Sequence, residues 1–548
     1  MLTAGLLLRL ISLSNFPVGF NADEASNGYD AYSILNTGRD QWGIPMPLIL
    51  KSFGDFKSPL YTYLTIPSIA SLGLTKFAVR LPNAILGTLA VLITYLLIRE
   101  LTKKYKEGLG ITNIETPALV GAALLAVNPW HIMMSRTGLE ANLVTLFIPL
   151  GVYFFFKGLI NPRFYIWSAL SFGLSLFTYH SAKIVAPLII LGLIITFWKD
   201  LKEVGFKKLL APALIIMLFL GGLIYTFSLG GGARALERSI TQGALLQGAE
   251  QKIKLINSGT NPMIARLLHN KYQVTVQRFV NNYSQYFSSR FLFVKGAGES
   301  SYGMIPGIPA IYLVDGLLLL GLIPIILKKS MRKLTSILMF WLVISPLPAA
   351  LSTGVGYSGN RAETMISIIP ILAAFGFIGW GIILRKSGKN VALSITGIAI
   401  LLVFLQTSVF IKSYFKYPGD ATVNSMLYGS LEVAQWLKEN SGDKRVIISR
   451  SLGEPQIFIA FAGKWDPADF QNETKNWGFT ESGVPWVDQI PSYEVGKYTF
   501  KSLDLKVDTS VKNSLIIGRP EEFPKDVKAL ETIKYPGGSP AIIVVNAN

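Results

Sequence analysis

The chain has 548 residues, of which 51% are hydrophobic and 15% are charged, and its formal net charge is +18. This charged fraction lies well below the about 25% of ordinary soluble domains, so the composition argues against a purely soluble protein. Many Lys and Arg residues lie in short loops between apolar segments, which excludes nucleic acid as the reason for the positive charge. The absence of cysteine excludes disulfides and thiolate chemistry.

Apolar segments recur along the first three quarters of the chain. A helix needs about 20 mostly apolar residues to cross the hydrocarbon core of a bilayer, and most of these segments approach that length. We predict a polytopic α-helical membrane protein with about eleven transmembrane helices. The predicted spans are 1–15, 77–98, 117–134, 139–156, 164–180, 182–198, 209–228, 309–327, 334–352, 363–384 and 390–411.

The short loops between the spans form two sets of different charge. One set holds 17 Lys and Arg in 46 residues, whereas the other holds five. Cytoplasmic loops carry the excess of positive residues, so the first set is predicted to be cytoplasmic, with the N-terminus. Loop 16–58, loop 229–308 and the tail after 412 are then outside. The basic set is 99–116, 157–163, 199–208, 328–333 and 385–389, and the other is 16–58, 135–138, 181 and 353–362.

Two adjacent acids, Asp23 and Glu24, follow the first apolar segment. Asn21 is a candidate N-cap, Glu24 stands three residues later as in a capping box, and Gly38 is a candidate helix end. We therefore expect a short helix on the outer side that carries both acids in its first turn, where the helix dipole favours them. Such acids are usually solvated capping residues, but they are also available for chemistry.

The long loop 229–308 contains a helical pattern from 262 to 289. Apolar residues recur there at spacings of three and four. We predict an amphipathic helix that lies along the membrane interface or covers a cavity, although a helix that only packs would show the same pattern. The apolar residues are Ile264, Leu267, Leu268, Tyr272, Val276, Phe279, Tyr283 and Phe287.

From residue 413 the pattern changes to short strands and helices. This alternation predicts a C-terminal extracytoplasmic α/β domain at 413–548, after a transmembrane module at 1–412. A helix is expected over 425–439. Strands are expected at RVIIS, QIFIAFAG, SLIIG and AIIVV, with a further helix at EEFPKDVKALETI. Neither GxGxxG nor a P-loop signature occurs, so we expect an accessory role.

Charged residues gather at the outer ends of the predicted spans. Each has a simple explanation: Arg136 and Glu140 are four residues apart and could pair on a helix, and Lys183 and Arg361 could anchor helix ends. Their shared side and depth favour a function, because charges at membrane depth are costly. The set comprises Asp23, Glu24, Asp55, Lys57, Arg136, Glu140, Lys183 and Arg361, and Tyr179 and His180 are predicted near the same surface.

Several cations and a few acids at the membrane edge suit a lipid-linked phosphate. Arg and Lys bind phosphate oxygens and stabilise the charge that builds on a leaving phosphate. A carboxylate is then needed to take the proton from an acceptor hydroxyl. These residue types therefore indicate glycosyl transfer from a polyprenyl-phosphate sugar, although their spacing does not identify it uniquely.

Four stretches of the sequence resemble a known family. They read ADEASNGYDAYSILNTG, FKSPLYTYLTIP, AVRLPNAILGTLAVLITYLLIREL and NPWHIMMSRTGLEANL. They are similar to the GT-C membrane glycosyltransferases, most closely to the protein O-mannosyltransferase-like superfamily, which includes the bacterial enzymes that transfer aminoarabinose to lipid A. The resemblance covers most of 1–230 and, more loosely, 309–410.

The resemblance implies an inverting transferase with its site on the outer face of the plasma membrane. It points to Asp23 as the catalytic base, with Glu24 as its neighbour, and to Lys57 before a proline as a contact to the donor phosphate. An acid in the second outer loop of the family, preceded by an arginine, corresponds to Glu140 and Arg136. The arginine that opens a late span corresponds, less closely, to Arg361. Lys183 is added to the predicted donor-binding residues because it lies near the same outer surface. The secondary candidates are Asp55, Tyr179, His180 and His269.

The sequence departs from the aminoarabinose transferases at one position. Those enzymes carry a Glu directly before the lysine, and it helps to bind zinc. Here that position is Phe56, with Asp55 one residue earlier, and His269 is the only obvious imidazole partner. A lone loop histidine is more often not a ligand, so no cofactor is assigned and a divalent metal is left open.

The predicted function is that of a hexosyl- or pentosyltransferase. The partners are a polyprenyl-phosphate sugar, a protein, lipid or glycan acceptor, and membrane lipids, whereas the sugar and the acceptor stay open. A transporter or flippase for a lipid-linked sugar is the alternative, since it needs the same cations; no internal repeat of the transporter type is found. An oligosaccharyltransferase ranks lower because the WWDYG signature is absent.

Overall fold

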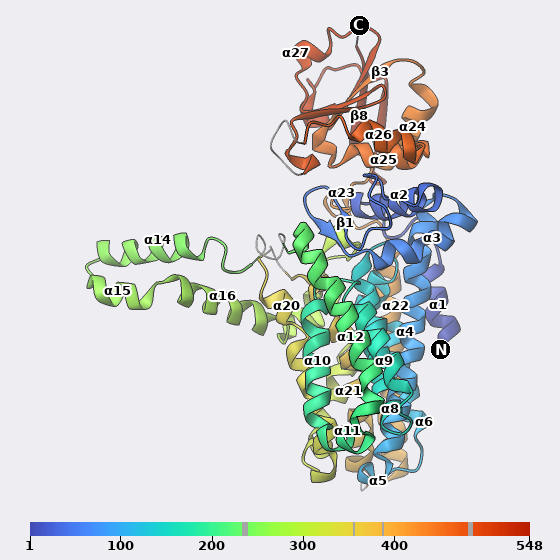
Figure 1. Cartoon of the computed structure of the whole chain (residues 1–548), viewed down its shortest axis with the longest axis vertical. Coiled ribbons are helices and arrows are strands. Elements are labelled where there is room, and N and C mark those ends of the chain that lie inside the picture. The colour runs from blue at the N-terminus through green and yellow to red at the C-terminus, as the bar shows by residue number, and fades with distance from the viewer. Residues whose placement is uncertain (233–238, 354–356, 386–387, 480–485, 548) are drawn as a thin grey trace.

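The computed structural model describes the chain except for residues 233–238, 354–356, 386–387, 480–485 and 548. A helical bundle forms its body, and an α/β region sits over one end of the bundle (Figure 1). We call this region, which follows α22, the α/β tail, and the bundle end beneath it the tail end. An arm of three helices projects sideways close to the same end (Figure 1).

The bundle consists of apolar helices, as predicted. Among the described residues, six helices are long and apolar enough to cross a membrane, or seven if the bent pair α10 and α11 is one span. The predicted number of about eleven spans is therefore not confirmed, although shorter apolar helices fill the bundle. The long helices are α4 (Lys76–Lys104), η1 with α8 (Glu140–Leu143, Val144–Gly158), α12 with η2 (Phe206–Thr226, Phe227–Gly231), η5 with α19 and α20 (Lys329–Met331, Arg332–Ile344, Leu347–Ala350), α21 (Thr364–Leu384) and α22 (Lys389–Tyr414). The others are α1 (Leu2–Leu10), α6 (Glu115–Val127), α7 (Pro129–Met134), α9 (Phe164–Ser175), α10 (Ala182–Thr196), α11 (Trp198–Val204), α17 (Leu313–Leu320) and α18 (Ile323–Ile326).

The helices differ in how deeply they lie in the bundle. The buried share of the apolar span is 72% in α21 but only 11% in α12 and 6% in α22. Helix α21 makes close contacts through glycine: a Cβ at Gly376 would run into the Leu318 carbonyl. Small residues at such contacts let membrane helices approach closely. Hence α21 is a central helix, whereas α12 and α22 present their apolar surface to lipid.

The predicted basic loops, as far as the structure describes them, lie at the end of the bundle opposite the α/β tail. Helices α5 (Lys106–Leu109) and α11 mark this end (Figure 1). Lys328 Nζ donates there to the carbonyls of Gly108 and Leu109 at 3.2 and 3.4 Å. The grouping of these loops at one end therefore agrees with the pattern of charge along the sequence.

The capped helix predicted after the first apolar segment forms as α2 (Ala22–Thr37). The Asn21 side chain accepts the Glu24 backbone N–H at 2.8 Å, and the Glu24 carboxylate accepts the Asn21 N–H at 3.4 Å. The helix ends at Gly38, whose φ of 70° suits glycine. Helix α2 lies across the tail end, between the bundle and the tail (Figure 1). Next along the chain come β1 (Leu50–Lys51), β2 (Phe56–Lys57) and α3 (Leu60–Leu72).

The tail contains a six-stranded mixed sheet of order β4-β5-β3-β6-β8-β7. Three of the predicted strands are confirmed, as is a helix near 425–439, which begins at Ser430. The elements are β3 (Arg445–Ser449), β4 (Ser492–Val495), β5 (Tyr498–Lys501), β6 (Ser514–Gly518), β7 (Glu531–Lys534), β8 (Pro540–Asn546), α23 (Asp420–Asn424), α24 (Ser430–Asn440), α25 (Pro455–Gly463), α26 (Pro467–Thr474) and α27 (Leu505–Asp508).

Two predictions for the tail are wrong. QIFIAFAG is not a strand but helix α25, which begins with Pro455 and is buried throughout its apolar run, where periodicity cannot separate strand from helix. EEFPKDVKALETI is not a helix, because Pro524 interrupts it; its end forms strand β7. The hairpin of β4 and β5 was not predicted.

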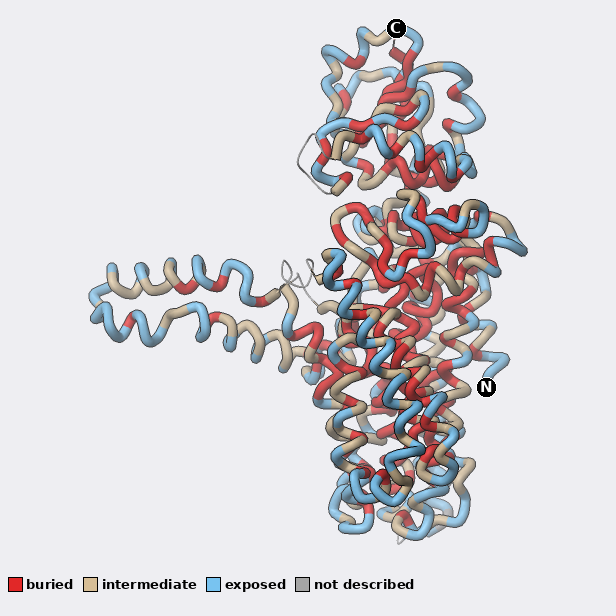
Figure 2. Tube along the Cα trace, in the orientation of Figure 1, coloured by how far each residue is buried: buried red, intermediate tan, exposed pale blue. Residues whose placement is uncertain are grey.

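The arm comprises α14 (Ala244–Asn257), α15 (Pro262–Leu268) and α16 (Lys271–Gln285). The single helix predicted over 262–289 is therefore broken between α15 and α16. Asn270 causes the restart, because its side chain caps α16 by accepting two backbone N–H groups. Figure 2 shows buried stretches in the bundle and the tail, whereas most of the arm is exposed or intermediate.

Candidate functional site

The two adjacent acids of α2 have different environments. Glu24 is fully buried, and both of its oxygens are bound by Arg80 of α4, at 2.8 Å from Nε and 2.9 Å from Nη2. The Gly138 N–H also donates to Glu24, at 2.7 Å. A buried charge of this kind is stable only when it is paired and hydrogen-bonded. Glu24 therefore holds α2 against α4 and the loop after α7.

Asp23 is oriented by its neighbour. Successive residues of a helix point about 100° apart, so the buried Glu24 turns Asp23 away from Arg80. Asp23 is half-buried, and its nearest hydrogen-bond donor is the Ser52 hydroxyl, at the long distance of 3.5 Å. Its carboxylate is thus less engaged than that of Glu24 and is the better placed of the two to accept a proton.

Lys57 lies beneath the same face of α2. Strand β2, which ends with Lys57, pairs antiparallel with β1, and this turn buries the side chain. Lys57 Nζ donates to Ser26 Oγ at 2.8 Å, and Ser26 Oγ donates to Asp30 at 3.3 Å. Gln41 donates to Asp30 from its backbone at 3.0 Å and from its side chain at 3.1 Å. This network fixes the ammonium group of Lys57.

The sequence analysis missed Ser26, Asn27 and Asp30. Burial raises the pKa of Asp30, although the nearby Lys57 acts in the opposite direction. The signal was present in the sequence, since these residues follow Asp23 at spacings of three, four and seven and share one face of α2. A polar face on a helix that two layers cover indicates a buried polar network rather than a solvated surface.

Glu140 connects the acids to the cations. It begins η1 and is buried, and Asp23 and Lys57 both lie within electrostatic range of it. Lys183, at the start of α10, lies within range of the same carboxyl group. The structure therefore brings these four predicted residues into one cluster.

Tyr179, His180 and Arg361 extend this cluster. The Tyr179 hydroxyl accepts a hydrogen bond from Asn360 at 2.5 Å, and both Glu140 and Arg361 lie within electrostatic range of it. His180 Nδ1 lies 3.4 Å from Lys183 Nζ. Arg361 ends η6 (Gly359–Arg361), so a segment far along the chain reaches the same cluster.

Arg136 does not face the cluster. Helix α7 ends at Met134, so Arg136 and Glu140 do not share the helix that a four-residue ion pair requires. Instead, the fully buried guanidinium donates to the carbonyls of Leu8 at 2.8 Å and Ile11 at 2.6 Å, and it lies 5.4 Å from the ring of Tyr414. These hydrogen bonds tie Arg136 to the start of the chain, and its role as a phosphate ligand stays a prediction.

The structure does not bring Asp55 and His269 together. Asp55 is buried in the turn between β1 and β2, whereas His269 ends α15 in the arm, with its Nδ1 3.0 Å from Gln251 Oε1. Within the residues that the structure describes, no group of three or more His, Asp or Glu side chains could hold a metal ion. A metal held by this pair is therefore not supported by the geometry.

The α/β tail covers the cluster. It is bound to the segment that carries Asp23 by backbone and side-chain hydrogen bonds: Phe20 N–H donates to the Met426 carbonyl at 2.9 Å, and Tyr29 Oη donates to the Trp465 carbonyl at 3.1 Å. The aromatic pairs across this contact are Phe20–Phe461, Tyr29–Phe470, Trp42–Trp477 and Phe56–Trp486.

The tail also brings a carboxyl group towards Asp23. Burial, assisted by the charges of Asp23 and Asp488, raises the pKa of Glu454 to about 7. Glu454 precedes α25, the helix that packs on α2. A carboxyl group of the tail therefore belongs to the electrostatic environment of Asp23, which the sequence alone could not have indicated.

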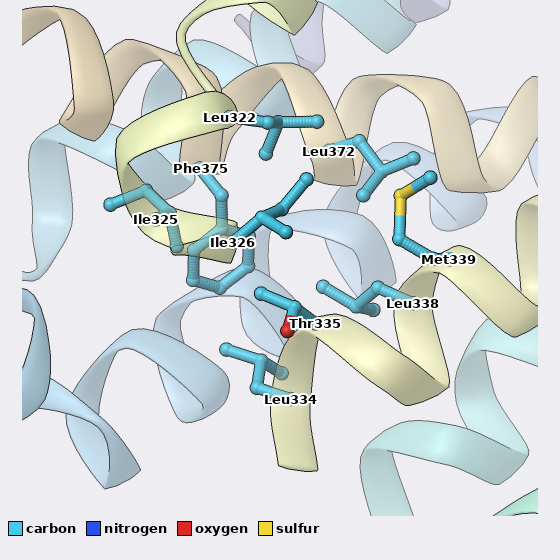
Figure 3. Close-up of a pocket in the computed structure, with 9 residues that line it drawn as sticks. All are labelled: Leu322, Ile325, Ile326, Leu334, Thr335, Leu338, Met339, Leu372 and Phe375. Carbon is cyan, nitrogen blue, oxygen red and sulfur yellow. The ribbon is translucent and has the colours of Figure 1, made fainter. Parts of the chain in front are cut away.

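Apolar side chains on either side of η5 line a small pocket (Figure 3). It is enclosed by α18, α19 and α21, and Thr335 is the only residue among those that line it with a polar side chain. None of the candidate site residues lines it. Its walls are Leu322, Ile325, Ile326, Leu334, Thr335, Leu338, Met339, Leu372 and Phe375.

Comparison with known proteins identifies the fold. Residues 57–225 match the family described as dolichyl-phosphate-mannose-protein mannosyltransferase. ArnT from Cupriavidus metallidurans bound to undecaprenyl phosphate superposes with a TM-score of 0.52 at 12% identity, over 99% of this chain and 96% of that one. This chain therefore has the fold of the ArnT structure. The apo state of the same ArnT matches with a TM-score of 0.51 at 11% identity, over the same shares of both chains. No curated protein sequence matches the chain.

Proposed function

We propose that the chain is a membrane glycosyltransferase that moves a sugar from a polyprenyl-phosphate donor to an acceptor hydroxyl on the extracytoplasmic side. The observation that carries this proposal is the convergence of Asp23 and Glu140 with three cations at the tail end of a GT-C fold. The ArnT structure with bound undecaprenyl phosphate supports the class of donor. The cations are Lys57, Lys183 and Arg361.

The cations hold the donor phosphate in this mechanism. Lys57 is oriented before any ligand binds, because Ser26 and the Asp30 network fix its ammonium group. Lys183 lies within electrostatic range of Glu140, and Arg361 lies within range of Tyr179, which is itself within range of Glu140. As the bond between the sugar and the phosphate breaks, negative charge builds on the leaving phosphate, and preorganised cations stabilise it without reorganisation. No strong general acid is needed, because a phosphate leaves readily.

Asp23 acts as the general base. The acceptor oxygen attacks the anomeric carbon while its proton passes to the Asp23 carboxylate, and the electron pair of the broken carbon–oxygen bond leaves with polyprenyl phosphate. Attack opposite the leaving group inverts the configuration at that carbon. Glu24 does not exchange protons in this scheme; its ion pair with Arg80 positions Asp23.

We propose that the chain divides into a transmembrane module at 1–412 and an accessory α/β domain at 413–548 on the extracytoplasmic side. The basic loops at the opposite end of the bundle support this orientation. The domain covers the candidate site, and its Glu454 lies within electrostatic range of the proposed base. We infer that the acceptor approaches Asp23 from this side.

The test is release of polyprenyl phosphate by the purified chain, supplied with a panel of polyprenyl-phosphate sugars and cell-envelope acceptors. We expect release by the wild type and its loss in Asp23→Asn, with donor binding kept in both. Movement of the donor across vesicles without acceptor, together with no release of polyprenyl phosphate, would contradict the proposal and favour a flippase.

A further inference from the structure

In the described part of the chain, the arm is anchored to the bundle at its base. Arg278 of α16 donates to the carbonyls of Ile240 at 2.8 Å and Gln242 at 2.7 Å, in the segment that leads into α14, and the Ile240 N–H donates to the Leu351 carbonyl at 3.1 Å. Closer to the bundle, Tyr283 Oη donates to the Val343 carbonyl at 2.8 Å. Beyond this base the arm extends across the direction of the bundle helices, close to the tail end (Figure 1). It does not cover the candidate site.

Large apolar side chains are exposed along the whole arm. Leu246 and Ile253 of α14 are 69% and 54% exposed, and Val276 of α16 is 61% exposed. At the tip, Met263 and Leu267 of α15 reach 77% and 74%. A soluble surface rarely shows a continuous set of this size without a partner.

These exposed side chains do not lie on the face through which the helices of the arm pack against each other. Helices α14 and α16 meet through small or buried residues, and a Cβ at Gly248 would lie 3.1 Å from the Asn270 backbone. Val274 is buried on the same side, whereas Val276 two residues later is exposed. Since residues two apart in a helix point to different sides, the exposed apolar stripe has no partner within the arm.

The charge of the arm indicates what covers it. Residues 244–285 contain five basic residues and a single acid, Glu250. Lys and Arg beside an apolar stripe lie along it with their stems and reach phosphate headgroups with their charged ends. The aromatic rings of Phe279 and Tyr283, 5.7 Å apart, stand where the arm joins the bundle, as aromatic residues do at membrane interfaces.

We propose that the arm is an interfacial membrane anchor that lies in the anionic headgroup layer of the leaflet at the tail end, with its apolar stripe in the acyl chains. The spans before and after the arm hold it at the level of this leaflet, so lipid is always within reach. The anchor broadens the footprint of the chain on the leaflet. It does so whether or not the chain transfers sugar, so the inference does not rest on the proposed function.

A pair of single-cysteine variants tests the depth of the arm. The chain has no cysteine, so Val276→Cys and Gln277→Cys each carry one environment-sensitive fluorophore. Both positions are exposed and lie one residue apart along α16, on different faces of the helix. In nanodiscs that contain spin-labelled phospholipid, we expect several-fold stronger quenching at position 276 than at 277.

Two outcomes would overturn the proposal. Equal, weak quenching at both positions would show that the arm stands in water. A probe at 276 that is shielded from water but not quenched by lipid, with crosslinking between two copies, would show a protein interface instead.

The basic residues are tested by lipid composition. We expect the quenching at position 276 to be stronger with phosphatidylglycerol than with phosphatidylcholine alone. Replacing Lys252, Lys254, Arg266 and Lys271 by Gln should abolish this difference, whereas replacing the three lysines by Arg should preserve it. If quenching at position 276 still differed between the two lipids in the Gln variant, the basic residues would not contact the headgroups as proposed.

Discussion

The polar face of α2 and the apolar stripe of the arm invert the usual arrangement of side chains in opposite ways. At α2, the charged groups of Glu24, Asp30 and Lys57 are buried, whereas in the arm Leu267 and Val276 are exposed. Each inversion has a cost unless something compensates for it. At α2 the protein itself supplies the ion pairs and hydrogen bonds, whereas in the arm the compensation comes from outside. The comparison teaches that a buried charge cluster indicates a prepared site and an exposed apolar stripe indicates a surrounding medium.

The largest effect is expected at Asp23. If this carboxylate is the base, Asp23→Asn should lower transfer by about a thousandfold, within the range that a general base contributes. Transfer is measured as polyprenyl phosphate released per minute, and donor binding by the same variant serves as the control. Transfer by the variant at the wild-type rate would remove Asp23 from the mechanism and leave α2 with only a structural role.

The second effect concerns stability rather than chemistry. Arg80→Met leaves the buried Glu24 without its cation, which should cost about 3–5 kcal/mol of unfolding free energy. Thermal unfolding in detergent measures this loss. The double variant Glu24→Gln with Arg80→Met should recover part of it, because no uncompensated charge is then buried. A single variant as stable as the wild type would show that the pair does not hold α2.

Lys57 should affect donor binding. Lys57→Met removes a charged hydrogen-bond donor, so we expect affinity for a polyprenyl-phosphate sugar to fall by about tenfold to a hundredfold, equivalent to about 1.5–3 kcal/mol. Lys51→Met, in the strand paired with it, is the matched control and should bind the donor normally. Equal losses in both variants would indicate damage to the hairpin of β1 and β2 instead.

Glu454 should give stability a pH dependence. Its pKa is raised from 4.5 to about 7, so between these values the folded state holds a proton that the unfolded state has lost. Stability from this group is therefore present below pH 4.5 and is lost as the pH rises through 7. The temperature of thermal unfolding should fall less steeply between pH 5 and 8 in Glu454→Gln than in the wild type. Unchanged slopes would show that the tail does not bury this carboxyl group.

The smallest effect is expected in the arm. Met263 and Leu267 are mostly exposed, so replacing both by Ser should change stability in detergent by less than about 0.5 kcal/mol. The same variant should reduce contact of the arm with lipid in nanodiscs. A large loss of stability in detergent would mean that these side chains pack against the protein. The arm would then be compensated from within the protein, as α2 is.

Much of the fold follows from local pattern. The spacing of Asn21, Glu24 and Gly38 predicts α2 with both of its ends, because capping depends on residues a few positions apart. Apolar length and loop charge predict a membrane bundle with its basic loops at one end. The break in the arm at Asn270 was missed, as was the helical state of α25, since a short apolar run carries no reliable period.

Only part of the candidate site could be predicted from the sequence. The types and positions of Asp23, Lys57, Glu140, Lys183 and Arg361 indicated a lipid-phosphate site, and their roles stay predictions. Sequence spacing could not separate these residues from Arg136, whose donors hold carbonyls of the first segment. That distinction depends on which groups meet across more than a hundred positions of the chain.

The sequence by itself determined the membrane bundle, the capped α2, and the charged residues that lie at one end, because each depends on composition or on neighbours within a few residues. Only the tertiary structure decided that Glu24 is bound by Arg80 while Asp23 is not, that the tail covers α2, and that the arm extends away from the bundle. The physical reason is that burial and pairing are properties of groups far apart in the chain, and no local pattern encodes which of two adjacent acids meets a cation.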